Sequence, residues 1–122
     1  MLESNKNAIL QEMDRKVEKA LTMIGLQAVG YAQEYAHVDT GNLQNSIQSQ
    51  VDIADDSVVI GTDVEYAPYV EFGHLQEVGR FVPKLGKRLV KPQAPAYPFL
   101  RPALEKHLEE YNRIANDVLK NG

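Results

Sequence analysis

The stretch Val38-Asp39-Thr40-Gly41-Asn42-Leu43-Gln44-Asn45-Ser46-Ile47 divides the chain into two parts with different hydrophobic periods. Before it, apolar residues recur every three or four positions, and after it they alternate, which are the periods of a helix and of a strand. Within it, Asp39 or Thr40 can accept a backbone N–H and Gly41 can adopt positive φ, with Asn42 completing the turn cluster. We therefore expect these four residues to form the structural turn that leads from a helix into a sheet.

Residues 1–36 are predicted to form one long amphipathic helix. About 30 residues of helix span about 45 Å, which is longer than a small domain needs. Gly25 and Gly30 are weak points at which a bend is expected. If the helix is continuous, its N-terminal part projects and packs on a neighbouring molecule. The apolar stripe that predicts this helix consists of Ile9, Met13, Val17, Leu21, Ile24, Ala28, Ala32 and Tyr35.

Residues 37–73 are predicted to contain the turn, a hairpin and a short helix. Alternation over residues 47–53 predicts a strand with one apolar face, residues 54–57 a connection, and residues 58–61 the antiparallel return strand. Tyr66, Tyr69 and Phe72 recur at helical spacing, and Pro68 suits a first helical turn. Gly73 is then expected to end this short helix.

The remainder is predicted to form an extended basic arm over residues 74–96 and a helical segment over residues 97–122. The arm contains five glycines and prolines, so it reads as a long loop or an irregular hairpin with short strands at 81–82 and 89–90. The C-terminal helix is expected over residues 101–120, on a stripe that starts at Leu104. The prediction is a single α+β domain spanning residues 1–122, with an antiparallel sheet packed against a long N-terminal helix and a C-terminal helix.

Composition limits the function classes. The content of 43% hydrophobic and 25% charged residues is that of an ordinary globular protein. The chain has no cysteine, which excludes disulfides and thiolate metal sites, and no apolar run of the length that crosses a bilayer. The net charge of −4 is unevenly distributed, because residues 1–77 carry four basic and thirteen acidic side chains. All five charges of residues 78–97 are basic: Arg80, Lys84, Lys87, Arg88 and Lys91.

Three catalytic or binding interpretations compete against this background. The tripeptide at 39–41 is that of aspartic proteases, in which two aspartates share a proton, so a homodimer would be required. That motif lies in β-rich chains, whereas here it follows a long helix. His37 with Asp39, or Glu71 with His74, suggests a metal site, but neither pair has the further carboxylates that such bundles use.

A nucleic-acid-binding module is the third interpretation. The rings of Tyr66, Tyr69 and Phe72 and the basic arm are the side chains on which single strands stack. However, Glu65 and Glu71 beside the rings repel phosphate, which favours core or subunit contacts instead. No phosphate-binding loop or nucleophile elbow is present in the sequence.

Three phrases taken together resemble a known family. They are residues 39–47, residues 64–73 (Val-Glu-Tyr-Ala-Pro-Tyr-Val-Glu-Phe-Gly) and residues 98–104 (Pro-Phe-Leu-Arg-Pro-Ala-Leu), with Ile60-Gly61-Thr62 between the first two. In this order and spacing, they closely resemble the tail-component family of the Hong Kong 97 type, found in siphophages and prophages. The resemblance covers about residues 5–118, by the spacing of these phrases.

The resemblance implies a virion structural protein at the head–tail junction, with no catalysis and no cofactor. Such proteins act in tail completion or head–tail joining, or alternatively as tail terminators or tail-assembly proteins. The expected partners are further copies of the chain in a six-fold ring, the adjoining head-connector, and tail-tube or tail-terminator proteins. DNA is expected to pass through the channel without sequence-specific binding. The subunit would be made in the host cytoplasm and reside in the virion, with no membrane contact.

The resemblance and the sequence pattern also suggest roles for particular residues. The basic arm contacts are expected at Arg80, Lys84, Lys87, Arg88 and Lys91. Core or subunit contacts are expected at Leu43, Tyr66, Tyr69, Glu71, Phe72, Gly73, Pro98, Phe99 and Pro102.

Overall fold

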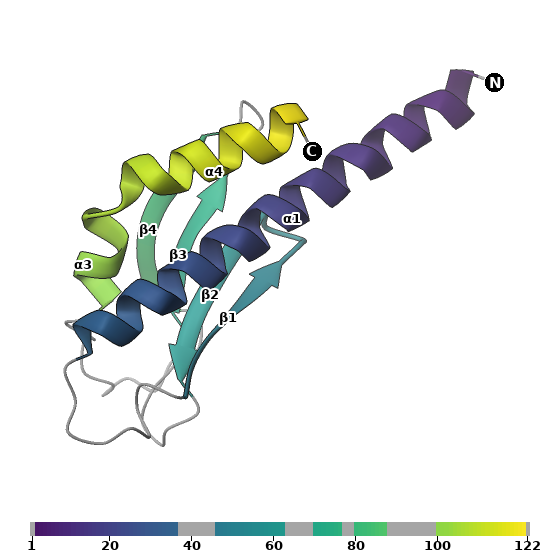
Figure 1. Cartoon of the computed structure of the whole chain (residues 1–122). Coiled ribbons are helices and arrows are strands. Elements are labelled where there is room, and N and C mark those ends of the chain that lie inside the picture. The colour runs from purple at the N-terminus through teal and green to yellow at the C-terminus, as the bar shows by residue number, and fades with distance from the viewer. Residues whose placement is uncertain (1, 37–45, 63–69, 77–79, 88–99, 122) are drawn as a thin grey trace.

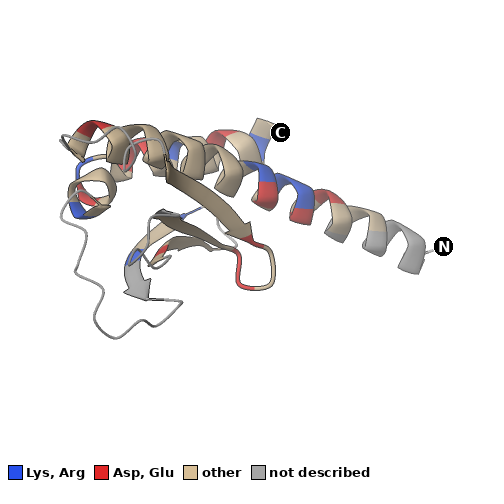
Figure 2. Ribbon diagram, turned by 90° about the horizontal axis from the view of Figure 1, so that it is seen from below, with Lys and Arg blue, Asp and Glu red and all other residues tan. Residues whose placement is uncertain are grey.

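The computed structural model describes residues 2–36, 46–62, 70–76, 80–87 and 100–121. These residues form two layers, with helices on one face of a four-stranded sheet (Figures 1 and 2). Helix α1 (Leu2–Tyr35) crosses that face and extends well beyond it at its N-terminal end (Figure 1). The predicted α+β architecture and the long N-terminal helix are confirmed.

Helix α1 is continuous through both of its glycines. Gly25 is buried where the helix crosses the sheet, and a Cβ there would lie 2.8 Å from Ser49 Oγ and 3.0 Å from Val58 Cγ2. Glycine therefore permits a close approach between helix and sheet instead of bending the helix. Gly30 has no atom within 4 Å of its own would-be Cβ.

The sheet is an antiparallel meander with the order β1-β2-β3-β4. Strand β1 (Ile47–Asp52) pairs with β2 (Ser57–Thr62) in an unbroken register from Ile47↔Thr62 to Asp52↔Ser57, as the hairpin prediction requires. The connecting turn occupies residues 53–56, one position earlier than predicted. Asp56 adopts a left-handed φ of 50°, and its carbonyl accepts a 2.8 Å hydrogen bond from the N–H of Leu75.

The short helix predicted up to Phe72 is wrong for its last residues, because Val70–Leu75 form strand β3. The β3 register shifts between Glu71 and Gly73 on the β4 side, and this irregularity disturbs the alternation that would have revealed a strand. Gly73 does not end a helix. Its would-be Cβ would collide with the ring of Phe81 and lie 2.7 Å from the Val82 carbonyl oxygen, so close strand packing requires glycine there.

The extended arm predicted over residues 74–96 is also partly wrong. Residues 74 and 75 end β3, and β4 (Phe81–Lys87) pairs with β3 as the fourth strand of the sheet. The alternative of an irregular hairpin is the one the structure supports for these residues. Residues 88–96 lie outside the described part of the chain.

The predicted C-terminal helix is divided into α3 (Leu100–Glu105) and α4 (Leu108–Asn121). Lys106 and His107 form a turn between them, in which the Lys106 N–H donates to the Pro102 carbonyl at 3.0 Å. Helix α3 lies at an angle to α4, and both helices pack on α1 (Figure 1).

An aromatic cluster joins the two layers. The rings of Phe72 and Phe81 from the sheet both meet Tyr111 of α4 edge to face, with centroids 5.6 and 5.7 Å apart. The buried Tyr111 hydroxyl donates to the Ala103 carbonyl, and Asn112 Oδ1 accepts the Phe81 N–H at 2.9 Å. This cluster joins α3 and α4 to strands β3 and β4.

Candidate functional site

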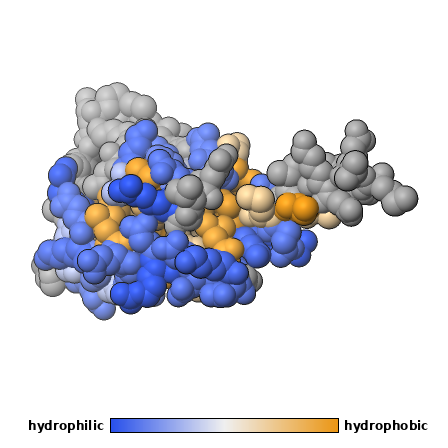
Figure 3. Space-filling model, turned by 90° about the horizontal axis from the view of Figure 1, so that it is seen from above, coloured by the Kyte–Doolittle hydropathy of each residue, from blue (hydrophilic) through white to orange (hydrophobic). Residues whose placement is uncertain are grey.

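The first candidate surface is the protruding segment, defined as residues 8–17 of α1. Ile9 and Met13 are 61% and 49% exposed although both belong to the apolar stripe of the helix. Val17 is half-buried against the core, and Leu21 and Ile24, the next stripe residues, are fully buried. Figure 3 shows hydrophobic side chains on the part of the helix that extends from the body. The stripe therefore continues past the end of the subunit's own core.

Acidic and basic residues follow one another along the protruding segment (Figure 2). Glu12 and Asp14 are exposed acids, and Arg15 and Lys16 are the bases between them and the body. Arg15 Nη1 lies 3.3 Å from Glu12 Oε2, a pair at i,i+3 spacing that supports the exposed helix by a few tenths of a kcal/mol. The segment thus combines apolar and charged groups, as subunit contacts combine an apolar centre with a polar rim.

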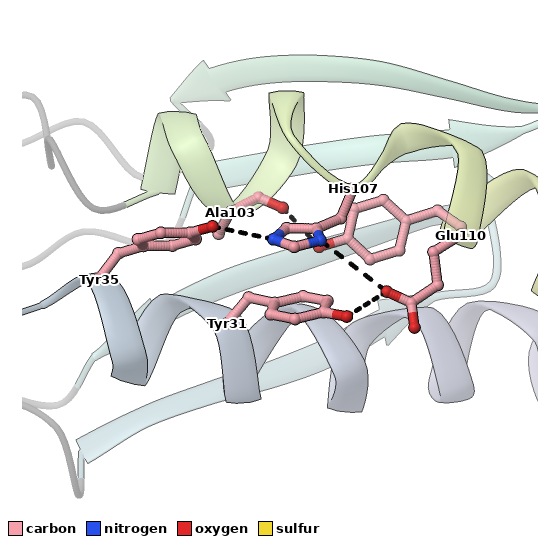
Figure 4. A network of polar contacts seen from close by, with 6 residues as sticks. Tyr31, Tyr35, Ala103, His107 and Glu110 are labelled. Atoms are coloured by element: carbon pink, nitrogen blue, oxygen red, sulfur yellow. Dashed lines mark hydrogen bonds and ion pairs between the residues drawn. The ribbon is translucent and has the colours of Figure 1, made fainter.

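The second candidate surface is the His107 network, which consists of Tyr31, Tyr35, His107 and Glu110 (Figure 4). The Tyr31 and His107 rings are stacked with centroids 3.4 Å apart and planes 4° apart. Tyr35 Oη lies 3.0 Å from His107 Nε2, and the Tyr31 hydroxyl donates to Glu110 Oε2. His107 Nδ1 is 4.0 Å from the same carboxylate oxygen, which makes an ion pair when the imidazole is protonated.

The contacts of the His107 network affect the pKa of Tyr31 and bring a cation to the Tyr35 ring. The hydrogen bond to the Glu110 carboxylate raises the pKa of Tyr31, since an anionic acceptor favours the protonated phenol. Lys106 Nζ lies 5.3 Å from the centre of the Tyr35 ring, within cation–π range. The network connects the C-terminal half of α1 to the corner between α3 and α4.

An open depression of about 380 Å³ lies beside this corner. Its wall includes three acids, Glu105, Glu109 and Glu110, and two bases, Lys106 and Arg113. Such mixed charge does not select an anionic or a cationic ligand. Within the described ranges, no group of three or more histidine and acidic side chains is placed to hold a metal ion. In the same ranges, no helix combines the length and the apolar character needed to span a membrane.

Sequence reasoning missed the His107 network. Tyr31 and Tyr35 are four residues apart, and His107 and Glu110 are three apart, so each pair shares one helical side. That spacing was the available signal. The two pairs are separated by more than 70 residues, and only the tertiary fold brings them together.

Two of the predicted contact residues lie in the core. Phe72 is fully buried between Phe81 and Tyr111, and Gly73 is buried beside it. Pro102 is half-buried in the first turn of α3. The turn 39–42, with Leu43, Tyr66, Tyr69, Pro98 and Phe99, lies outside the described residues.

The predicted basic arm contacts are dispersed by the sheet. Arg80 is exposed directly before β4, whereas Lys84 Nζ lies 3.7 Å from Glu71 Oε2 of the adjacent strand. Glu71 and His74 lie on a strand, so the helical spacing that suggested a metal pair does not apply. Lys87 ends β4, while Arg88 and Lys91 lie outside the described residues.

Comparison with known proteins gives a match to a protein family. The model of the HK97-gp10-like family, described as "Bacteriophage HK97-gp10, putative tail-component", matches residues 1–73. This range contains α1, β1, β2 and the first part of β3. Searches of curated proteins and of solved structures gave no significant match.

Proposed function

The chain belongs to the HK97-gp10-like family of bacteriophage tail components, and from this membership we propose that it forms a ring at the head–tail junction. In this role it acts in tail completion or head–tail joining and resides in the virion neck. The ring consists of copies of this chain, six being the number expected, around the channel through which DNA passes.

The observation that carries the proposal is the protruding segment. A helix of 34 residues is about 51 Å long at 1.5 Å per residue, and its N-terminal part extends beyond the sheet (Figure 1). Ile9 and Met13 are exposed there on the same stripe that is buried from Ala20 onward. Burial of such side chains is worth about 1.5–3 kcal/mol each, so an assembled neighbour would stabilise both.

Exposed charged residues outside the protruding segment support further roles in the proposed ring. Asp55 is exposed in the turn between β1 and β2, and like charge on a channel wall allows DNA to slide without being held. Arg80 is exposed at the start of β4 and is available to an acidic patch on a head-connector or tail-terminator ring. Lys87, Arg88 and Lys91 extend this basic stretch in the sequence.

The composition of purified particles tests the proposal. Quantitative mass spectrometry of virions should find this chain at a fixed ratio to the other neck proteins, at a ring-like copy number. Assembled tails that lack the protein, or contain it only in trace amounts, would show instead that it is an assembly factor that leaves the particle.

A variant of the basic stretch tests the joining step separately. Replacing Arg80, Lys87 and Arg88 with glutamate should leave the subunit folded, as judged by an unchanged unfolding midpoint, while free heads and free tails accumulate. Lys84→Gln is the matched control, because Lys84 already pairs with Glu71 inside the subunit. Normal joining with the triple variant would remove the basic stretch from the proposed contact.

A further inference from the structure

The two sides of the apolar stripe in the protruding segment carry opposite charge. Asp14 and Glu18 each follow a stripe residue by one position, which turns them about 100° to one side of Met13 and Val17. Lys16 precedes Val17 by one position and therefore lies on the other side, together with Lys19 three residues later. Asp14, Glu18 and Lys19 are exposed, and Lys16 is half-exposed.

One acid, Glu12, also lies on the basic side, but it does not make the net charge of that side negative. Glu12 precedes Met13 by one position, but its carboxylate is paired with Arg15 at 3.3 Å. The stripe is thus flanked by an acidic side, with Asp14 and Glu18, and a basic side, with Lys16 and Lys19. Balanced but segregated charges of this kind set the orientation in which two helices associate.

The relative direction of two packed copies determines which sides meet. When two identical helices run in the same direction, the basic side of one lies next to the acidic side of the other. When they run in opposite directions about a two-fold axis, basic meets basic and acidic meets acidic, which is repulsive. The charge pattern therefore favours neighbours whose helices run in the same direction, which is how rotation about a ring axis places adjacent helices that lie along that axis.

We propose that the protruding segment is the contact between neighbouring copies of this chain, with the helices side by side in the same direction. Lys16 and Lys19 of one copy face Asp14 and Glu18 of the next, and the neighbours enclose Ile9 and Met13. This inference rests on the proposed ring and adds its interface and polarity.

The contact is weak for an isolated pair of subunits. The exposed apolar groups of a segment of about three turns fall short of the roughly 1,600 Å² buried by a standard stable interface. A ring gains each contact from a neighbour that is already held in place, which raises the effective concentration. The measurement therefore captures transient contacts covalently and does not rely on a stable oligomer.

Cross-linking of the full chain tests the polarity, since the chain has no cysteine and introduced thiols are unique. With a short bismaleimide, the Asp14→Cys/Lys16→Cys double variant should give a ladder of dimers, trimers and larger species. The single variants Asp14→Cys and Lys16→Cys should remain monomeric alone and give dimers when mixed. Dimers from Lys16→Cys alone would show helices that run in opposite directions, and a double variant that stops at dimers would show a closed pair. Either result would overturn the proposal.

Two further variants control for collision and for altered folding. Gln11→Cys/Arg15→Cys places two thiols on the helix side opposite the stripe, and should give no ladder at the same protein concentration. The double cysteine variant at positions 14 and 16 is then changed further. Glu18→Lys, with Lys19 retained, should lower the ladder yield about tenfold. Adding Lys19→Glu to that variant should restore the yield. An equal ladder from the control pair, or no ladder from any variant, would also overturn the proposal.

Failure of this proposed interface can be distinguished from failure of the proposed neck function. Particles that contain the chain at ring-like copy number, with no ladder in solution or in the particle, would retain the neck role and reject this interface. Absence of the chain from particles together with the predicted ladder would reject the neck role and retain the interface.

Discussion

The two halves of α1 have the same sequence pattern but different surroundings. In residues 20–35 the stripe is buried under α3, α4 and the sheet, with Leu21, Ile24 and Ala28 fully enclosed. In residues 8–17 the same periodicity continues, but Ile9 and Met13 face solvent. A helical period therefore predicts which side of a helix is apolar, whereas the length of the adjoining layer determines where that side is covered.

The two halves of α1 are also expected to affect different properties, the inner half the stability of the subunit and the outer half its assembly. The inner half is held by core packing and by the His107 network, so changes there are expected to unfold the subunit. The outer half touches little of its own chain, so changes there are expected to leave the subunit folded and to affect association. Four predictions are given in order of decreasing effect, three on α1 and one on Tyr111 of α4.

The largest effect is expected from Leu21→Ala in the inner half. Leu21 is fully buried, and truncation of a buried leucine costs about 2–5 kcal/mol of unfolding free energy, from lost transfer energy and the cavity that remains. Urea denaturation monitored by circular dichroism measures this cost. A change below about 1 kcal/mol would mean that the inner half is not packed as described.

The two glycines of α1 should respond with opposite signs to the same substitution. Gly25→Ala places a Cβ within 3.0 Å of Ser49 and Val58, and this overpacking should cost about 1–3 kcal/mol. Gly30→Ala meets nothing within 4 Å and should stabilise the helix by up to about 1 kcal/mol. Thermal unfolding of both variants provides the comparison, and equal shifts would contradict the close crossing at Gly25.

A pH-dependent effect is expected from the buried Tyr111. Burial raises the pKa of Tyr111 well above its ordinary value, because the charged phenolate is poorly solvated in the core. Above about pH 10 the unfolded chain loses this proton and the folded chain keeps it, so stability falls with rising pH, by up to about 1.4 kcal/mol per pH unit. Below about pH 10 this contribution is fully present.

Tyr111→Phe isolates that contribution. The variant should lose about 1 kcal/mol at neutral pH, from the missing hydrogen bond to the Ala103 carbonyl, and should show a shallower decline in alkaline solution. Denaturation midpoints over a pH series measure both quantities. An unchanged alkaline slope would show that Tyr111 does not hold its proton in the folded state.

The smallest effect on the subunit is expected from Met13→Ala, the outer counterpart of Leu21→Ala. Met13 is half-exposed, so its truncation should change the unfolding free energy by less than about 0.5 kcal/mol. The same variant should reduce the cross-linked ladder, since the apolar side chain is enclosed only between copies. A large loss of subunit stability would mean that the protruding segment packs on its own chain.

Local patterns predicted the elements whose periods are regular. The stripe of α1 and the alternation of β1 and β2 were sufficient, because each is set by neighbours close in sequence. Strand β3 was missed because its register shift between Glu71 and Gly73 breaks the alternation, while the aromatic spacing before it imitates a helix. The corner at Lys106 and His107 was missed because the apolar stripe continues through it.

The two candidate surfaces also differ in how far the sequence alone predicts them. Projection of the first helix could be predicted, since its length exceeds that of a small domain. The charge segregation around Met13 is equally visible in the sequence, but it has meaning only once the structure shows that this part of the helix leaves the core. Tyr35 was expected on the apolar stripe, yet its partner His107 lies 72 residues away, a distance in sequence that periodicity cannot bridge.

The most direct measurement is a reconstruction of the neck of the assembled particle by electron cryo-microscopy. It should show a closed ring of this chain in which the protruding segment of each copy runs beside that of the next in the same direction. Lys16 of one copy should face Asp14 and Glu18 of its neighbour. A neck without this chain, or a ring whose protruding segments extend into solvent, would contradict the proposed contact between copies.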